Sequence, residues 1–282
     1  MSTLFFLQLK GELRKLFARK RTYIGFAAFL LLEMLILALF QIPKVRREFP
    51  GKFIARLGGA FDEYFSGQTL ALIMLLATFT LTMLYLALVG GDVVAKEVEE
   101  GTMRMALCRP VSRVRLLLVK YAACVIYTFA LVYFVAASAL VMGFIKEGNG
   151  GLFVIAPEQQ IVEMYPAGEG YLRYAGSLSF LALSSLSITT AAFVCSCFNM
   201  KPAAATIISL TFFFIDWIFY HLPYFESIKG WFLTRNMTTW ANIFRPHIPW
   251  HQMLEDYAYL IGVDITLVVI GVVAFSVRDF KS

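Results

Sequence analysis

Six long runs of apolar residues alternate with shorter polar segments along the chain. The runs cover residues 22–42, 68–89, 116–145, 171–198, 202–222 and 257–277. Each is about as long as the ~20 residues with which a helix crosses the hydrocarbon of a bilayer, and the third and fourth are long enough to tilt. The pattern predicts an all-α integral membrane protein with six transmembrane helices, built as a single domain over residues 1–282.

A different periodicity precedes the first run. In residues 2–20 apolar side chains such as Phe5, Leu9, Leu13 and Leu16 recur at steps of three and four, and basic side chains fill the remaining face. A helix of this kind that leads directly into a span is expected to lie along the membrane surface as an elbow helix. The alternative, a helix packed on a soluble domain, is less favoured because the sequence predicts no such domain.

The longer polar segments are expected to form loops. Residues 90–115 form a loop on the N-terminal side of the membrane, and residues 43–67, 146–170 and 223–256 form loops on the opposite side. Residues 43–67 contain a second amphipathic stretch, and residues 146–170 carry the glycines and prolines of a loop. Residues 223–256 are rich in tryptophan and proline, so a re-entrant hairpin and a folded external loop both remain open.

The distribution of Lys and Arg predicts how the chain is oriented in the membrane. Of the 25 Lys and Arg residues, 15 lie on the side of the N-terminus, which places both termini in the cytoplasm of a cell-membrane protein. Five basic residues in 43–67 oppose this assignment. The net charge of +6 does not indicate nucleic-acid binding, because the basic residues flank the apolar runs, where they meet lipid headgroups.

Composition agrees with the membrane class and offers little chemistry. Hydrophobic residues make up 59% of the chain and charged residues 16%, against roughly 45–50% and 25% in soluble domains. The four cysteines and three histidines have neither a disulfide nor a zinc-binding pattern. A nucleotide-binding phosphate loop and a hydrolase motif are missing, so we expect no enzyme activity and no cofactor on this chain.

The most informative segment joins the second and third runs. It reads GGDVVAKEVEEGTMRMALCRPVSRVRLLLVKY, from residue 90 to residue 121. Helical spacing up to Glu100 is followed by Gly101, which favours a left-handed helix end. After Pro110, Ser112 is a suitable N-cap for the helix that becomes the third span. A short helix, a sharp turn and a return into the bilayer are therefore predicted.

This segment resembles the cytoplasmic loop of permease subunits of type-2 ATP-binding-cassette (ABC) exporters. The matching positions are Asp92, Glu97, Gly101, Thr102, Pro110, Ser112, Arg113 and Lys120. Residues 12–15 and 278–280 also resemble the family, and the span layout agrees with it over the whole chain. The resemblance is specific to the superfamily and says nothing about the transported substrate.

The resemblance implies a function in transport. The loop would be a coupling helix seated in a separate cytoplasmic ABC ATPase, and ATP and Mg would bind to that partner. Glu97 and Glu100 would face basic residues of the ATPase, and Arg109 and Arg113 acidic ones. A second permease copy or a paralogue would complete the transporter.

Three carboxylates fall inside the predicted spans, namely Glu33, Asp216 and Asp264. Because a charged carboxylate is costly in hydrocarbon, each is expected to face the bundle interior or water. They could line a translocation path, or they could form structural hydrogen bonds between helices. Two alternative functions depend on them: a membrane-embedded enzyme, and a secondary transporter that couples to protons through Glu33 or Asp216.

Overall fold

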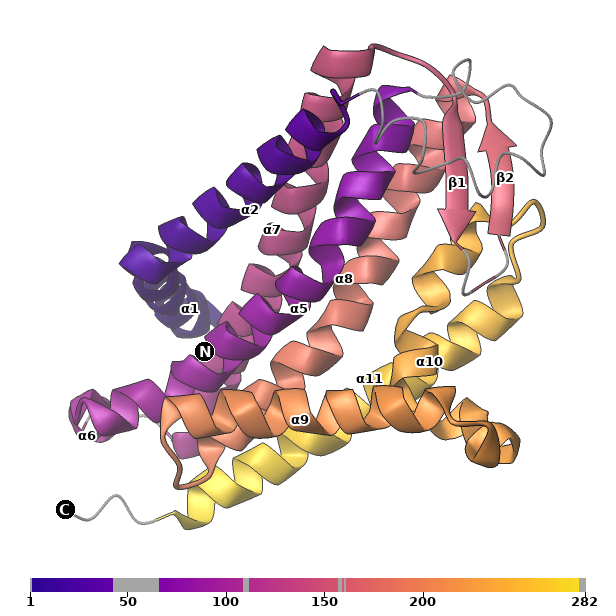
Figure 1. Cartoon of the computed structure of the whole chain (residues 1–282). Coiled ribbons are helices and arrows are strands. Elements are labelled where there is room, and N and C mark those ends of the chain that lie inside the picture. Colours follow the sequence, from indigo (N-terminus) through magenta and orange to yellow (C-terminus); the bar gives the residue numbers. More distant parts are fainter. Residues whose placement is uncertain (1, 43–65, 109–111, 157–158, 160, 279–282) are drawn as a thin grey trace.

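A computed structural model of the chain describes residues 2–42, 66–108, 112–156, 159 and 161–278. It contains six helices that are long and apolar enough to cross a membrane, which confirms the predicted fold class (Figure 1). They are α2 (Lys20–Leu39), α5 (Gly67–Glu99), α7 (Arg113–Glu147), α8 (Ala167–Cys197), α9 (Pro202–His221) and α11 (Trp250–Val277). The amphipathic stretch expected within 43–67 lies outside the described residues.

Helix α8 is the most buried of the six and occupies the middle of the bundle. It packs against α5, α7, α9 and α11. Its small side chains, including the buried Ser187 and Ala192, permit this close packing. The core of the protein is therefore arranged around the fourth span.

Two adjacent glycines let α5 approach two other helices at once. A Cβ on Gly90 would lie 2.7 Å from the backbone oxygen of Thr189 in α8. A Cβ on Gly91 would lie 2.5 Å from the Thr206 hydroxyl in α9. Since consecutive helical residues point in directions about 100° apart, the pair brings α5 against α8 on one face and against α9 on the next.

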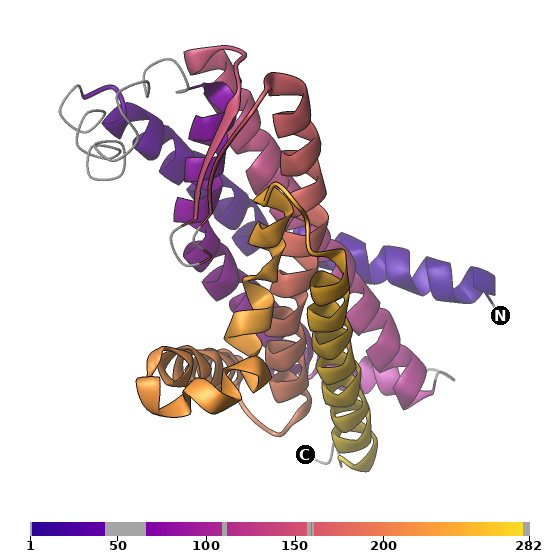
Figure 2. The same cartoon turned by 90° about the vertical axis from the view of Figure 1, so that its right-hand side faces the viewer.

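The N-terminal segment forms a separate helix, α1 (Ser2–Ala18), which packs against α7. Arg19 has an extended backbone between α1 and α2, so the two helices meet at an angle (Figure 2). Leu16 is buried at this junction, and its carbonyl accepts a hydrogen bond of 2.6 Å from the Thr22 hydroxyl. The expected amphipathic helix is present, with its apolar side partly covered by α7.

Residues 146–170 contain a hairpin that the sequence analysis did not predict. Strand β1 (Leu152–Ala156) pairs antiparallel with β2 (Ile161–Tyr165), from Leu152 opposite Tyr165 to Ala156 opposite Ile161. The hairpin packs against α5, where the Phe153 N–H donates a 3.0 Å hydrogen bond to the Thr69 hydroxyl. The glycines and prolines of this segment favour a loop, and the two strands between them, of five residues each, are too short to give a clear pattern of their own.

Residues 223–256, for which the sequence allows a re-entrant hairpin or a folded external loop, form short helical segments up to Phe244 and the start of α11 from Trp250. They are the 3₁₀ helix η2 (Pro223–Trp231), α10 (Leu233–Met237) and the 3₁₀ helix η3 (Thr239–Phe244). The side chains of η3 are buried against α8 and α11, whereas η2 has no buried residue. Helix α9 crosses the bundle obliquely before them, and α11 already begins at Trp250 (Figures 1 and 2).

Candidate functional site

The candidate site is the connection between α5 and α7. Helix α5 does not stop with its apolar run but continues to Glu99, so the predicted short helix is the polar end of the second span. Gly101 has a φ of 73°, which is the expected left-handed end. A second short helix, α6 (Thr102–Leu107), follows. The Ser112 hydroxyl then accepts a hydrogen bond of 3.3 Å from the Arg115 N–H and caps α7 as predicted.

Both arms of this connection are tied to α1 by charged side chains. The Lys120 ammonium at the start of α7 lies 2.8 Å from a Glu97 oxygen of α5 and 2.8 Å from a Glu12 oxygen of α1. Lys15 lies 2.7 Å from Glu12 and 3.5 Å from Glu97. We call Glu12, Lys15, Glu97 and Lys120 the charge cluster. It joins three helices and contains two positive and two negative groups.

Most of the charge cluster is shielded from solvent. The Lys120 side chain is 1% exposed, and those of Glu97 and Glu12 are 8% and 12% exposed. Buried charges are tolerated only when they are paired, because water no longer solvates them. Here Lys120 has two carboxylate partners, so the loss of any one member leaves an unbalanced charge inside the protein.

The pKa shifts of Glu12 and Lys15 favour the charged form of both groups. Burial by itself would raise the pKa of Glu12, but Lys120 and Lys15 lower it more, so it lies below the ordinary value of 4.5. Burial would lower the pKa of Lys15, but Glu12 and Glu97 raise it above 10.5. The stabilisation is therefore present at neutral pH, and is lost as pH falls through the lowered Glu12 value or rises through the raised Lys15 value.

A second ion pair holds the start of α2 to α5. A guanidinium nitrogen of Arg21 lies 2.8 Å from an oxygen of Asp92, whose side chain is 9% exposed. The Arg21 carbonyl accepts a hydrogen bond of 3.0 Å from Tyr85, and the Tyr85 ring lies directly over Gly25. Asp92 therefore fixes the first span to the second at this end of the bundle.

Arginines also tie the end of α11 to its neighbours. The Arg113 guanidinium donates to the backbone oxygens of Ser276 and Arg278, at 3.0 and 2.9 Å. Arg278 in turn donates to the carbonyl of Phe198 and the side-chain oxygen of Asn199, at 2.9 and 2.8 Å. The third, fourth and sixth spans are thereby connected through two arginines.

The tip of the connection is exposed. Glu99, Glu100, Met105 and Cys108 are exposed there, and Met105 retains 68% of its accessible surface. The Thr102 hydroxyl points back and donates a 3.2 Å hydrogen bond to the Glu97 carbonyl. The predicted Arg109 and Pro110 lie outside the described residues. The motif thus divides into anchoring residues, namely Asp92, Glu97, Arg113 and Lys120, and an exposed tip.

Glu33 is enclosed between helices. It has no exposed surface, and one carboxyl oxygen lies 3.0 Å from the Ser138 hydroxyl of α7. The same hydroxyl lies 3.0 Å from the Val135 carbonyl. The one hydrogen of this hydroxyl can be donated to either acceptor or shared between the two. The other Glu33 oxygen has no partner among the described residues.

The other two carboxylates of the spans bind different neighbours. Asp264 in α11 accepts a hydrogen bond of 3.2 Å from Ser187 in α8. Asp216 in α9 accepts hydrogen bonds from the backbone N–H groups of Leu233 and Thr234, at 3.3 and 2.7 Å, and so caps α10. Among the described residues no hydrogen bond joins two of the three carboxylates, and no group of three metal-ligating side chains occurs.

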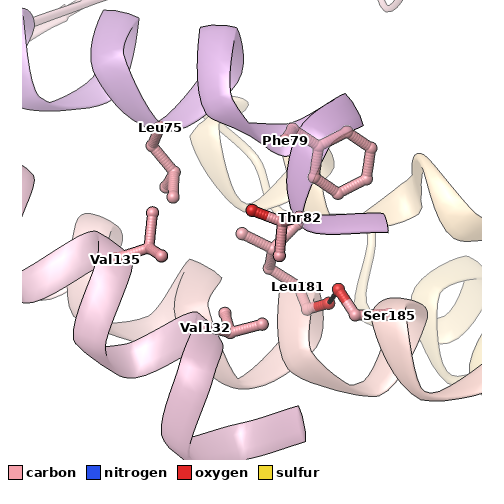
Figure 3. A pocket seen from close by; sticks show the side chains of 7 residues that line it. All are labelled: Leu75, Phe79, Thr82, Val132, Val135, Leu181 and Ser185. Atoms are coloured by element: carbon pink, nitrogen blue, oxygen red, sulfur yellow. Dashed lines mark hydrogen bonds between the residues drawn. The ribbon is translucent and has the colours of Figure 1, made fainter. Parts of the chain in front are cut away.

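A small void of about 10 Å³ lies between α5, α7 and α8 in the described part of the chain. Apolar side chains of α5, α7 and α8 close around it, with the hydroxyls of Thr82 and Ser185 at its edge (Figure 3). Both hydroxyls donate to carbonyls of their own helices, at 3.0 and 2.7 Å. About one water fits into such a volume. This void is far too narrow to serve as a path through the chain.

Sequence reasoning missed how the motif is anchored. It assigned Glu97 to a partner protein, whereas the structure places this carboxylate between Lys120 and Lys15 of the same chain. The missing information was the distance in sequence: Glu12 and Lys120 are 108 residues apart. The signal that was available is the pairing of Glu12 with Lys15 one turn apart on α1, next to the start of a span.

The fold defines a class: a multi-pass membrane protein with six candidate spans among its described residues. Residues 28–148 match the family described as "ABC-2 membrane transporter related". This stretch includes α5, α6 and α7, and hence the candidate site except for α1.

A curated relative matches over a similar length. It is the uncharacterised protein YhcI of Bacillus subtilis (strain 168), which is 27% identical over 126 residues. These residues make up 43% of this chain and 39% of the relative, so the match spans about two fifths of either protein. The family match agrees with the resemblance to ABC-2 permeases over residues 28–148.

Proposed function

We propose that this chain is the permease subunit of an ATP-driven exporter, and that α6 with the adjoining ends of α5 and α7 docks onto a separate cytoplasmic ATPase. The observation that carries the proposal is the charge cluster. It fixes both arms of the connection to α1 and leaves between them the short helix α6, with exposed side chains at Glu99, Glu100, Met105 and Cys108. A short element held in this way can pass a rigid-body movement of a partner to two spans at once.

The anchoring residues and the tip have different roles in this proposal. Glu97 and Lys120 neutralise each other inside the chain, so they position the tip instead of contacting the ATPase. Glu99, Glu100 and Met105 are exposed and form the contact surface. Two permeases and two ATPases form the transporter, and the substrate passes between the two permeases. The narrow central void of a single chain agrees with a path of that kind.

The test is ATP hydrolysis by the reconstituted complex. The chain is co-expressed with the ATPase encoded by a neighbouring reading frame, purified, and placed in lipid vesicles. Glu100→Arg at the exposed tip is expected to abolish co-purification and to return the hydrolysis rate to that of the ATPase alone, because it reverses a charge in the contact. Lys146→Glu, an exposed charge reversal at the opposite end of α7, is the matched control.

Unchanged co-purification and hydrolysis for Glu100→Arg would overturn the assignment of the tip. Since both variants change an exposed residue, both are expected to retain the elution profile of the folded chain. Transport by the purified chain without any ATPase would instead support the secondary-transporter alternative.

A further inference from the structure

A groove of about 410 Å³ lies on the side of the bundle between α5, α9 and the first turn of α2. All three segments reach the same end of the molecule, where the apolar runs of α2 and α9 begin and that of α5 gives way to charged residues (Figure 1). A boundary of this kind marks the depth of the lipid headgroups. The groove is therefore open where the membrane surface meets the protein.

One end of the groove carries three cations, Arg21, Lys96 and Lys201, and two carboxylates, Asp92 and Glu99, which leaves one positive charge in excess. Arg21 is paired with Asp92 at 2.8 Å. Lys96 is paired less closely, because its ammonium nitrogen lies 3.9 Å from a carboxylate oxygen of Glu100. Lys201 is exposed, and its ammonium group has no ion pair or hydrogen bond with the described residues. It precedes α9, whose first turn has no side-chain cap and presents backbone N–H groups. Two ammonium groups beside a helix N-terminus favour an anion such as a phosphate group.

The other end of the groove is apolar. Leu88 of α5 and Ile207 of α9 line it and are 38% and 62% exposed. One turn further along α5, Leu84 is 45% exposed on the same side, so the apolar wall continues along the span. Charge at one end and apolar surface at the other match an amphiphile with a phosphate headgroup and a hydrocarbon chain.

We propose that this groove binds one phospholipid of the surrounding leaflet. Its phosphate lies between Lys96 and Lys201, and an acyl chain runs along Leu88 and Ile207. Glu99 also lines the groove, one turn from Lys96, and its carboxylate has no partner within the described part of the chain. It can therefore pair with the amine of a zwitterionic headgroup. The site goes beyond the coupling function, and its occupancy requires no ATPase.

The experiment counts lipids on the purified full chain in dodecyl maltoside by native mass spectrometry during titration with dioleoylphosphatidylglycerol. One molecule is expected to bind more tightly than the rest. Replacing both lysines, in Lys96→Gln with Lys201→Gln, is expected to weaken it by roughly 30-fold, since each cation near a phosphate is worth about a factor of five. Lys229→Gln, on the far end of the protein, is the matched control.

Two further titrations separate the phospholipid from its parts. Inorganic phosphate, as a free anion, is expected not to displace the lipid, and dioleoylglycerol, which lacks the phosphate, is expected to bind at least tenfold more weakly. Displacement by inorganic phosphate, equal binding of dioleoylglycerol, or unchanged binding by the double variant would each overturn the proposal.

Ile207→Gln tests the apolar wall without touching the lysines, and so remains informative if the lysine variant does not fold. Because Ile207 is exposed, the variant is expected to fold, and the tight lipid is expected to bind several-fold more weakly. Binding equal to that of the unmodified chain would contradict the assignment of an acyl chain to this wall.

Discussion

Lys120 illustrates how one residue can serve two helices that are distant in sequence. Its ammonium group is enclosed by carboxylates of α1 and α5 at equal distances of 2.8 Å. In the sequence it is one basic residue at the start of an apolar run, and such a residue is usually interpreted as a headgroup contact. Its burial shows instead that it compensates charge inside the protein.

Lys120→Met is therefore expected to lower the stability of the folded chain by about 3–5 kcal/mol, because it leaves Glu12 and Glu97 buried with Lys15 as their shared partner. The measurement is thermal unfolding in detergent, followed by tryptophan fluorescence. Lys146→Met, an exposed position of the same helix, is expected to change the unfolding temperature little.

A triple variant tests whether charge or packing causes the loss. When Glu12→Gln and Glu97→Gln accompany Lys120→Met, the only charge left in the cluster is that of Lys15, whose side chain is 54% exposed, so no buried charge remains unpaired and much of the stability is expected to return. If the triple variant is as unstable as Lys120→Met alone, the role of Lys120 lies in packing and not in charge.

At the scale of the elements, close packing depends on positions that the hydrophobic pattern does not mark. Gly90 and Gly91 end an apolar run and are followed by the motif, so their spacing alone suggests only a flexible connection. In the structure they lie within a continuous helix and determine its distance from α8 and α9.

Gly90→Ala is expected to destabilise the chain by about 1–3 kcal/mol, because its Cβ would meet the Thr189 carbonyl at 2.7 Å and force α5 and α8 apart. Gly262→Ala in α11 is the control, since a Cβ there meets nothing within 4 Å. The control is expected to stabilise its helix by up to about 1 kcal/mol. Equal unfolding temperatures for the two variants would contradict the importance of this contact.

The parts of the fold and of the site that the sequence predicts are those that depend on local signals. Long apolar runs predict spans because the thickness of the bilayer fixes their length, and the signals at Gly101 and Ser112 are local, so both were confirmed. The β1–β2 hairpin and the capping of α10 by Asp216 depend on contacts between distant segments. Periodicity within one segment carries no information about such contacts.

For the whole molecule, the orientation in the membrane decides whether the tip can meet a cytoplasmic ATPase. Cys108 lies next to α6 and is exposed, whereas Cys124 and Cys197 are buried and Cys195 is partly buried. A single thiol therefore reports which side of the membrane the tip occupies.

An impermeant maleimide is expected to label the chain in membrane vesicles that expose the cytoplasmic face, and to leave it unlabelled in intact cells. The readout is the mass or mobility shift of the purified protein. Cys108→Ser is expected to remove the labelling and thereby to identify the site. Labelling of Cys108 in intact cells would place the tip outside and exclude its proposed contact with a cytoplasmic partner.

The arginine contacts at the end of α11 have a consequence for biogenesis. Arg278 is translated after the six candidate spans, yet its guanidinium donates to Phe198 and Asn199, and its backbone oxygen accepts from Arg113. The earlier helices therefore enter the bilayer before these hydrogen bonds can form. This face of the protein can acquire its final geometry only after translation has passed residue 278. In a nascent chain the surface that we propose to bind the ATPase would therefore be incomplete.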